Sequence, residues 1–192
     1  KRTKSNAEKL AEAYNVSFEE INITAAVRQH FIDIKHDESV TDITYENSQA
    51  RERTKILMNL SNKYGGLVIG TGDLSELALG WATYNGDHMS MYAVNVSIPK
   101  TLVRYLTAYE AEISDGELKT VLLDVLDTPV SPELLPPDKN GEIAQKTEDV
   151  VGPYELHDFF LYYFVRFGFT PSKIYYLAKR SFAGKYNNDK IK

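Results

Sequence analysis

A short apolar run with a glycine on each side constrains this chain most. The run covers residues 67–69, and three consecutive aliphatic side chains are typical of a strand that is buried on both faces. A tight turn at 70–73 and a predicted helix over 74–81 follow it directly. Strand, tight turn and helix form the unit of a parallel sheet, and ligands of such sheets bind beyond the carboxyl ends of the strands. The sequence therefore predicts an α/β fold with its chemistry between residues 71 and 87.

The other predicted elements are mostly helices. A capping box at 5–8 predicts a helix to about residue 14, and alternating apolar residues predict a strand over 16–23. The remaining expectations are a helix capped by Thr24, a polar loop over 35–44, a long helix over 45–64 that Gly65 and Gly66 end, and helices that begin at Pro99-Lys100, at 114–117 and at Thr170-Pro171.

The composition excludes several classes of protein. A chain of 192 residues with 43% hydrophobic residues can form one sizeable core, so one domain is expected. The net charge of −5, with no basic stripe, argues against a nucleic-acid partner. The absence of cysteine excludes disulfides and thiolate metal sites and favours a cytoplasmic location, and no apolar run approaches the roughly 18 residues of a membrane span. The four histidines lack the paired spacing of a zinc site, so ordinary structural roles are expected for them.

Two regions suggest contacts or functions beyond a simple core. Residues 127–152 form a long irregular segment with four prolines, and such a segment in a compact domain is usually functional or disordered. A set of aromatic residues surrounds most of one predicted helix, which is too wide for a single core face: Phe159, Phe160, Tyr162, Tyr163, Phe164 and Phe167. We therefore expect part of this set to pack against a second subunit or another domain, which predicts a homodimer or higher homo-oligomer.

The turn at 70–73 is a candidate anion site. It offers small residues, a hydroxyl and free amide groups at a helix N-terminus, which together favour a phosphate. The alternative is a purely structural connection, with Asp73 as the N-cap and Glu76 as the acid of a capping box. Lys100 follows Pro99 at a predicted helix start, where the helix dipole disfavours a cation, so either an anionic partner or simple solvation explains it.

Aromatic and polar residues follow the turn. Trp81 and Tyr84 precede the turn 85–87, and this arrangement suits the stacking of a ring beside a ribose or amide group, although a lone tryptophan is more often part of a core. Arg51 and Arg53 lie on the long helix and are equally consistent with a solvated face. No catalytic triad and no paired carboxylates stand out, so the region suits the binding and orientation of nucleotides.

Seven segments of the chain closely resemble NAD synthetases of the glutamine-dependent type: ENSQARER at 46–53, GTGDLSELALGW at 70–81, YNGDHMS at 84–90, NVSIPKTL at 95–102, SPEL at 131–134, VGPYELHDF at 151–159 and PSKI at 171–174. The resemblance implies the synthetase (ATP pyrophosphatase) domain of that family, with a Rossmann-like parallel sheet and flanking helices of the adenine nucleotide alpha hydrolase type. The family adenylates the nicotinate carboxylate of deamido-NAD, and ammonia then displaces AMP to give NAD. In glutamine-dependent members a separate glutaminase domain produces the ammonia.

The resemblance also implies roles for individual residues. The residues carried over to the deamido-NAD site are Asn47, Arg53, Glu76, Trp81, Tyr84 and Asp87. Thr71, Lys100 and Ser131 are carried over to the ATP site, and Glu76 to a Mg²⁺ site. Lys100 is the expected catalytic residue, because it would neutralise the phosphates as pyrophosphate leaves. Tyr84 stands where ammonia-dependent members have a lysine.

Parts of the family pattern have no counterpart in residues 1–192. These are the phosphate-binding loop of the form Ser-Gly-Gly-x-Asp-Ser, the glutaminase domain and a basic C-terminal segment. We therefore expect a partial synthetase domain, truncated at both ends, that is inactive alone because it lacks a cradle for pyrophosphate. The alternatives are another ATP-pyrophosphatase amide ligase, such as a GMP or asparagine synthetase, and a non-catalytic nucleotide-binding or dimerisation module.

Overall fold

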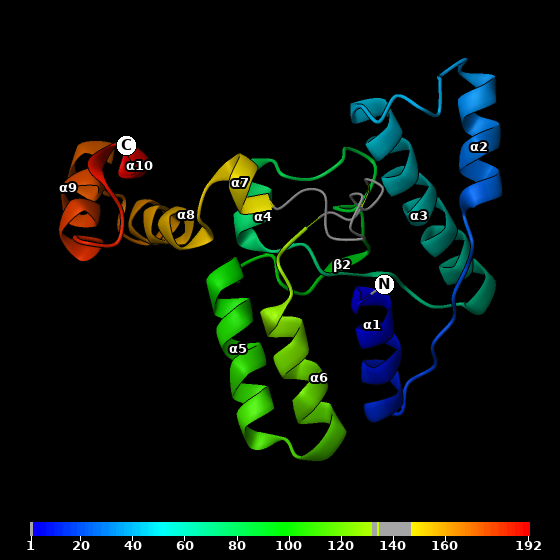
Figure 1. The fold of residues 1–192 in the computed structure, drawn as a ribbon, viewed down its shortest axis with the longest axis horizontal. Helices are drawn as coiled ribbons and strands as arrows, with labels where there is room; N and C mark the ends of the chain where they lie inside the picture. The colour runs from blue at the N-terminus through cyan, green and yellow to red at the C-terminus, as the bar shows by residue number, and fades with distance from the viewer. Residues whose placement is uncertain (1, 132–133, 135–146) are drawn as a thin grey trace.

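The computed structural model describes residues 2–131, 134 and 147–192 (Figure 1). Its elements, in chain order, are α1 (Arg2–Ala13), α2 (Thr24–Asp33), α3 (Ile43–Tyr64), β1 (Ile69–Gly70), α4 (Leu74–Leu79), β2 (Tyr92–Ala93), α5 (Lys100–Ile113), α6 (Gly116–Asp127), α7 (Thr147–Val151), α8 (Tyr154–Leu161), the π-helical segment η1 (Tyr162–Arg166), α9 (Pro171–Ser181) and α10 (Asn188–Ile191). Within this described part of the chain, no helix is both long and apolar enough to cross a bilayer.

The sheet is parallel, as the strand–turn–helix pattern predicts. β1 pairs with β2 in parallel register, Ile69 opposite Tyr92 and Gly70 opposite Ala93, and α4 lies in the connection between the two strands. The described residues thus form an α/β arrangement with a two-stranded sheet, which is only part of a Rossmann-like sheet. The prediction that the run 67–69 is buried on both faces is wrong here, because Leu67 and Ile69 are 59% and 51% exposed and no further described strand or layer covers them.

Two predictions near the N-terminus are wrong. Residues 16–23 form no strand, since the described chain offers no partner strand to make use of their alternation, and Phe18 and Ile21 are exposed. α1 begins at Arg2 and not at the predicted capping box, so Ser5 is an interior helical residue. Asn6 is buried in α1 instead, where its Nδ2 donates to Asp124 Oδ2 of α6 over 2.6 Å.

The helix boundaries with clear capping chemistry agree with the sequence. Gly65 ends α3 at a φ of +66°, a conformation that glycine adopts without strain. α3 begins two residues earlier than predicted, because the Asp42 side chain accepts from the amides of Thr44 and Tyr45 and caps the helix there. α9 begins with Pro171 in its first turn, as expected.

The helices form three groups in Figure 1. α6 packs against both α1 and α5, α2 packs on α3, and α8 leads away to α9 and α10. A small core of Leu156, Ala178 and Ile191 joins α8, α9 and α10, with aromatic residues packed around it. α4 lies between these groups and contacts both α5 and α8, so it connects the sheet to the two helices on which the candidate site is built.

The aromatic set is divided between this core and the surface. Phe159 and Phe160 pack against the α8–α10 core, whereas Tyr162, Phe164 and Phe167 are more than half exposed. The change from α-helix to π-helix at Tyr162 alters which side chains share a face. The prediction that one core face does not hold the whole set is therefore confirmed, while the homo-oligomer stays a prediction.

Candidate functional site

The turn 70–73 leads directly into a capped helix. Asp73 is buried, and its Oδ1 accepts from the Glu76 amide over 3.0 Å. Glu76 Oε2 in turn accepts from the Asp73 amide over 3.2 Å, which completes the capping box at the start of α4. The predicted capping role of these two acids is therefore confirmed, and Asp73 Oδ2 and Glu76 Oε1 take no part in the cap.

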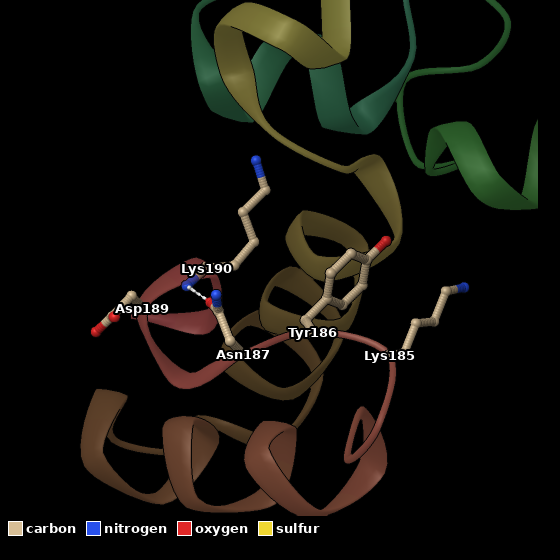
Figure 2. A pocket seen from close by; sticks show the side chains of 5 residues that line it. All are labelled: Lys185, Tyr186, Asn187, Asp189 and Lys190. Atoms are coloured by element: carbon tan, nitrogen blue, oxygen red, sulfur yellow. Dashed lines mark hydrogen bonds between the residues drawn. The ribbon is translucent and has the colours of Figure 1, made fainter.

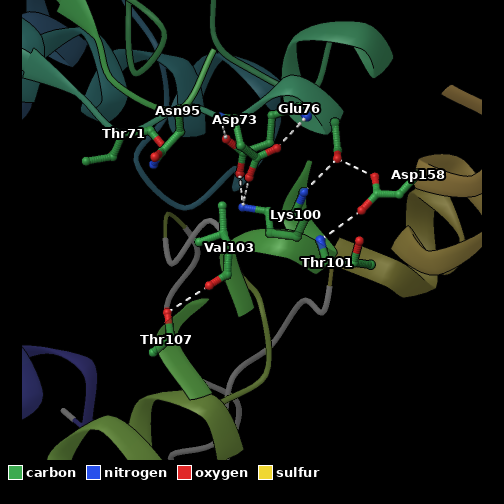
Figure 3. A network of polar contacts seen from close by, with 10 residues as sticks. Thr71, Asp73, Glu76, Asn95, Lys100, Thr101, Val103, Thr107 and Asp158 are labelled. Atoms are coloured by element: carbon green, nitrogen blue, oxygen red, sulfur yellow. Dashed lines mark hydrogen bonds and ion pairs between the residues drawn. The ribbon is translucent and has the colours of Figure 1, made fainter. Parts of the chain in front are cut away.

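Those remaining oxygens meet Lys100 at the start of α5. Lys100 Nζ lies 2.6 Å from Asp73 Oδ2 and 2.6 Å from Glu76 Oε1 (Figure 3). Burial disfavours the Lys100 ammonium, but the two carboxylates outweigh that effect and raise the pKa of Lys100. Anionic partners within the chain thus account for a lysine at an unfavourable end of a helix.

Ser75 and Asp158 complete this group, and neither was predicted from the sequence. Ser75 Oγ donates to Asp158 Oδ1 and accepts from the Lys100 amide over 2.9 Å. Asp158 Oδ2 accepts from the Thr101 amide over 2.8 Å. We call Asp73, Ser75, Glu76, Lys100 and Asp158 the lysine cluster. The one sequence signal for the two missing residues is Pro99, whose side chain cannot cap α5 and which therefore leaves that role to another element.

Tyr154 lies beside Lys100 of the lysine cluster. Its ring centroid lies 5.6 Å from Lys100 Nζ, a distance at which an ammonium is attracted to an aromatic face. Its buried hydroxyl has no hydrogen-bond partner among the residues that the structure describes. Burial and the nearby carboxylates of Glu76 and Asp73 raise the pKa of Tyr154 well above its usual value, so this side chain stays neutral.

A second group of polar residues forms where the chain turns after α4. Thr83 Oγ1 donates to Asn47 Oδ1 of α3 over 2.8 Å, and the Thr83 amide donates to Asp87 Oδ1 over 2.7 Å. His88 Nδ1 lies 2.7 Å from the Thr83 carbonyl oxygen. The structure thus joins the predicted residues Asn47 and Asp87 through Thr83, and we call residues 83–88 the tyrosine turn after its exposed tyrosine, Tyr84.

Tyr84 extends from this turn and is 75% exposed. Its ring stacks on His88 at 6.1 Å, and its carbonyl oxygen accepts from Arg51 Nε over 3.0 Å. Gly86 of the same turn is buried. A Cβ added to it would lie only 2.9 Å from Thr83 Cβ, so the close approach of these two residues requires glycine. The backbone of the turn is therefore fixed while the tyrosine ring is accessible.

The other predicted site residues lie outside these two groups. Thr71 is exposed, and its carbonyl oxygen accepts from Asn95 Nδ2 over 3.3 Å beside the lysine cluster (Figure 3). Trp81 is half-buried, Arg53 is exposed on α3, and Ser131 is half-buried. Most of the proline-rich segment 127–152 that follows Ser131 lies outside the described residues.

The described residues contain no group of three or more acids or histidines arranged to hold a metal ion. Glu76 and Asp73 nevertheless have the hard oxygen ligands that Mg²⁺ prefers, and this ion commonly uses one or two carboxylates together with water and substrate phosphates. Glu76 is the better candidate, because its side chain is 25% exposed whereas that of Asp73 is 2% exposed. The site therefore fits a Mg²⁺ ion that arrives with a phosphate ligand.

A surface hollow lies near the C-terminus, and Figure 2 shows the side chains that line it. It is lined by Lys185, Tyr186, Asn187, Asp189 and Lys190, where Asn187 caps α10. None of the predicted site residues lines it.

Comparisons with known proteins agree on one family. A family model described as NAD synthase matches residues 1–173. The chain is 49% identical over 185 residues to the glutamine-dependent NAD(+) synthetase of Mycobacterium bovis, an alignment that covers 92% of this chain and 27% of that protein. The chain thus spans little more than a quarter of the length of this relative.

Solved structures show the same relationship. NMN synthetase from Francisella tularensis superimposes with a TM-score of 0.68 at 25% identity, over 98% of this chain and 70% of that one. Glutamine-dependent NAD+ synthetase from Acinetobacter baumannii, in complex with ADP, superimposes with a TM-score of 0.56 at 26% identity, over 97% of this chain and 30% of that one.

Proposed function

This chain belongs to the NAD synthase family, and we propose that the protein of which it forms a part is a ligase that converts deamido-NAD to NAD with ATP and glutamine-derived ammonia. A carboxylate oxygen of the nicotinate ring attacks the α-phosphorus of ATP, and pyrophosphate leaves. Ammonia then attacks the acyl carbon of the adenylate, and AMP leaves with the electron pair of the broken C–O bond. The protein's task is to hold two nucleotides in line and to balance the charge that develops on pyrophosphate.

The lysine cluster is the observation that supports this proposal. Lys100 lies close to the turn after β1, at the edge of a parallel sheet where nucleotides bind. Its ammonium is neutralised by Asp73 and Glu76. We propose that the triphosphate competes for this ammonium, so that Lys100 contacts the phosphates and stabilises the negative charge of the departing pyrophosphate.

The same exchange gives Glu76 its role. When Lys100 turns to phosphate, Glu76 Oε1 loses its partner and is free to hold Mg²⁺. When bound, Mg²⁺ polarises the phosphoryl oxygens and offsets their charge. Asp73 keeps the helix cap in place throughout, since it is buried and bonded to the Glu76 amide.

The tyrosine turn and α3 would bind deamido-NAD. Asn47 and Asp87 are held in place through Thr83 and keep further hydrogen-bonding capacity for the dinucleotide. Tyr84 offers an exposed ring for stacking. The assignments of Trp81 and Arg53 to deamido-NAD, and of Thr71 and Ser131 to ATP, rest on the family resemblance.

The proposed activity belongs to a protein longer than these residues. The curated relative is almost four times as long as the matched region, which leaves room for a phosphate-binding loop and a glutaminase domain. We propose that residues 1–192 contribute one part of a cytoplasmic, homo-oligomeric synthetase and have negligible ligase activity alone.

Calorimetric titration of the complete protein with deamido-NAD tests the proposal. Asn47→Ala and Glu76→Ala should each weaken binding about tenfold or more, the usual consequence of losing a hydrogen bond to a charged or well-held group. Asn59→Ala and Glu117→Ala, exposed residues on α3 and α6, are matched controls and should leave the affinity unchanged. Unchanged affinity in both site variants would overturn the site assignment, and tight binding without NAD formation would favour a non-catalytic module.

A further inference from the structure

The N-terminus of α5 lacks a cap of its own. The first amides of a helix have no partner within the helix and need acceptors from elsewhere. The residue at the N-cap position is Pro99, and it makes no side-chain cap bond. Two other elements therefore have to satisfy the amides of Lys100 and Thr101.

Ser75 of α4 and Asp158 of α8 meet that need. The Lys100 amide donates to Ser75 Oγ and the Thr101 amide donates to Asp158 Oδ2, while Ser75 Oγ donates to Asp158 Oδ1. Both side chains are buried, at 0% and 7% exposure. The three bonds join α4, α5 and α8 at the residue that carries the ammonium of the site.

The negative charge of Asp158 is matched by α5 and not by a cation. Among the described residues no ion pair involves Asp158, so its carboxylate is stabilised by the amides and the positive end of the 14-residue helix α5. A buried carboxylate in this setting holds strong, charge-assisted bonds and resists displacement. It thus fixes the backbone from which the Lys100 side chain extends.

We propose that Asp158 is a positioning residue for Lys100, acting through the backbone of α5 and through Ser75. This inference rests on the proposed function, in which the Lys100 ammonium must reach the phosphates of ATP. Without Asp158 the first turn of α5 can shift, and a displacement of about 1 Å at a reacting centre can reduce a rate by about 100-fold.

Two variants separate the charge of Asp158 from its hydrogen bonds. Asp158→Ala removes both, and kcat of the complete protein should fall about 100-fold, while KM for deamido-NAD changes less than about threefold. Asp158→Asn retains one oxygen for the Thr101 amide and an amide group that can donate to Ser75 Oγ, so kcat should fall to an intermediate level. Glu155→Gln is the matched control on α8, since Glu155 bonds to Lys185 and Tyr186 and not to α5, and its kcat should not change.

A measurement without substrate distinguishes this inference from the proposed function. In the complete protein, the rate at which an amine-acylating reagent modifies Lys100 should rise about tenfold in Asp158→Ala, as followed by mass spectrometry. A shifted α5 moves Lys100 away from Asp73 and Glu76, whose carboxylates favour its protonated form, so the reactive neutral amine is more accessible and more often present. Lys119 and Lys173 serve as internal controls, because general unfolding would raise their modification rates as well. If Asp158→Ala does not fold, Asp158→Asn provides the same comparison.

Failure of the proposed function and failure of the role of Asp158 would give different results. A wild-type protein that makes no NAD would overturn the proposed function, whereas the acylation rates would still test Asp158. Unchanged kcat together with unchanged acylation of Lys100 in the folded variants would overturn the role of Asp158. A loss of kcat accompanied by faster modification of all three lysines would also overturn it, since that result indicates general destabilisation.

Discussion

The lysine cluster and the tyrosine turn differ in which groups are fixed. In the lysine cluster the charged side chains themselves are bonded, across sequence separations of 24 residues for Glu76–Lys100 and 83 for Ser75–Asp158. In the tyrosine turn Thr83 is bonded through its side chain to Asn47 and through its backbone to the side chains of Asp87 and His88, while the Tyr84 ring is exposed. A site with charges paired internally depends on substrate to compete for them, whereas the exposed Tyr84 ring can stack on a ligand without breaking a hydrogen bond of its own.

The largest effect on stability is expected from Lys100→Met. The substitution leaves the buried Asp73 carboxylate without its cation, and removing one partner of such a pair costs about 3 kcal/mol or more. Urea denaturation of the complete protein, followed by circular dichroism, measures the free energy of unfolding. The matched control is Lys185→Met, which breaks the exposed ion pair with Glu155 and should cost less than about 1 kcal/mol. Equal losses in the two variants would contradict the expectation that the buried Lys100–Asp73 pair stabilises the protein more than the exposed Lys185–Glu155 pair.

A smaller loss of stability is expected when the Lys100 ammonium is deprotonated instead of removed. The pKa of Lys100 is raised above its ordinary value of 10.5, so its contribution to stability is complete below that pH and is lost as the pH rises through the higher, folded-state pKa. The free energy of unfolding should therefore fall with alkaline pH above about 10.5. The raised pKa of Tyr154 acts in the same direction, so the pH series is measured in a Tyr154→Phe background. Adding Lys100→Met to that background should flatten the slope, and an unchanged slope would contradict the assigned charge pairing.

Local signals in the sequence predict one part of the lysine cluster and not the other. The capping box of Asp73 and Glu76 follows from residues three apart, and the turn into α4 follows from its glycines, so both agree with the structure. The roles of Ser75 and Asp158 depend on burial and on contacts between α4 and α8 that no local pattern encodes. Family resemblance identifies the segment around Asp158 without assigning the residue a partner.

The two wrong predictions about strands in the fold have a related cause. Alternation over residues 16–23 satisfies the local requirement of a strand, but a strand forms only with a neighbour, and no described strand lies beside it. The run 67–69 is likewise an adequate strand sequence, yet burial on both faces requires layers that the described residues do not provide. Periodicity therefore predicts how a segment is able to pack, and the partner decides whether it does.

The smallest effects are expected in the tyrosine turn, where stability and binding should separate. Thr83→Val keeps the shape of the side chain but removes its hydrogen bond to Asn47, so the free energy of unfolding should fall by about 1 kcal/mol. Binding of deamido-NAD should also weaken, because Asn47 loses the bond that orients it. Tyr84→Ala should change stability by less than about 0.5 kcal/mol, since its ring is exposed and its bond to Arg51 is made by the backbone.

Calorimetry of these two variants with deamido-NAD completes the comparison. If the turn presents side chains to the dinucleotide, Tyr84→Ala should weaken binding despite its normal stability, because about 1 kcal/mol of stacking is lost. Tyr105→Ala, which changes a similarly exposed tyrosine on α5, is the control and should bind normally. Normal binding by Tyr84→Ala together with weak binding by Thr83→Val would mean that the turn acts on the dinucleotide only through Asn47 and α3, and the exposed ring would then have no part in the site.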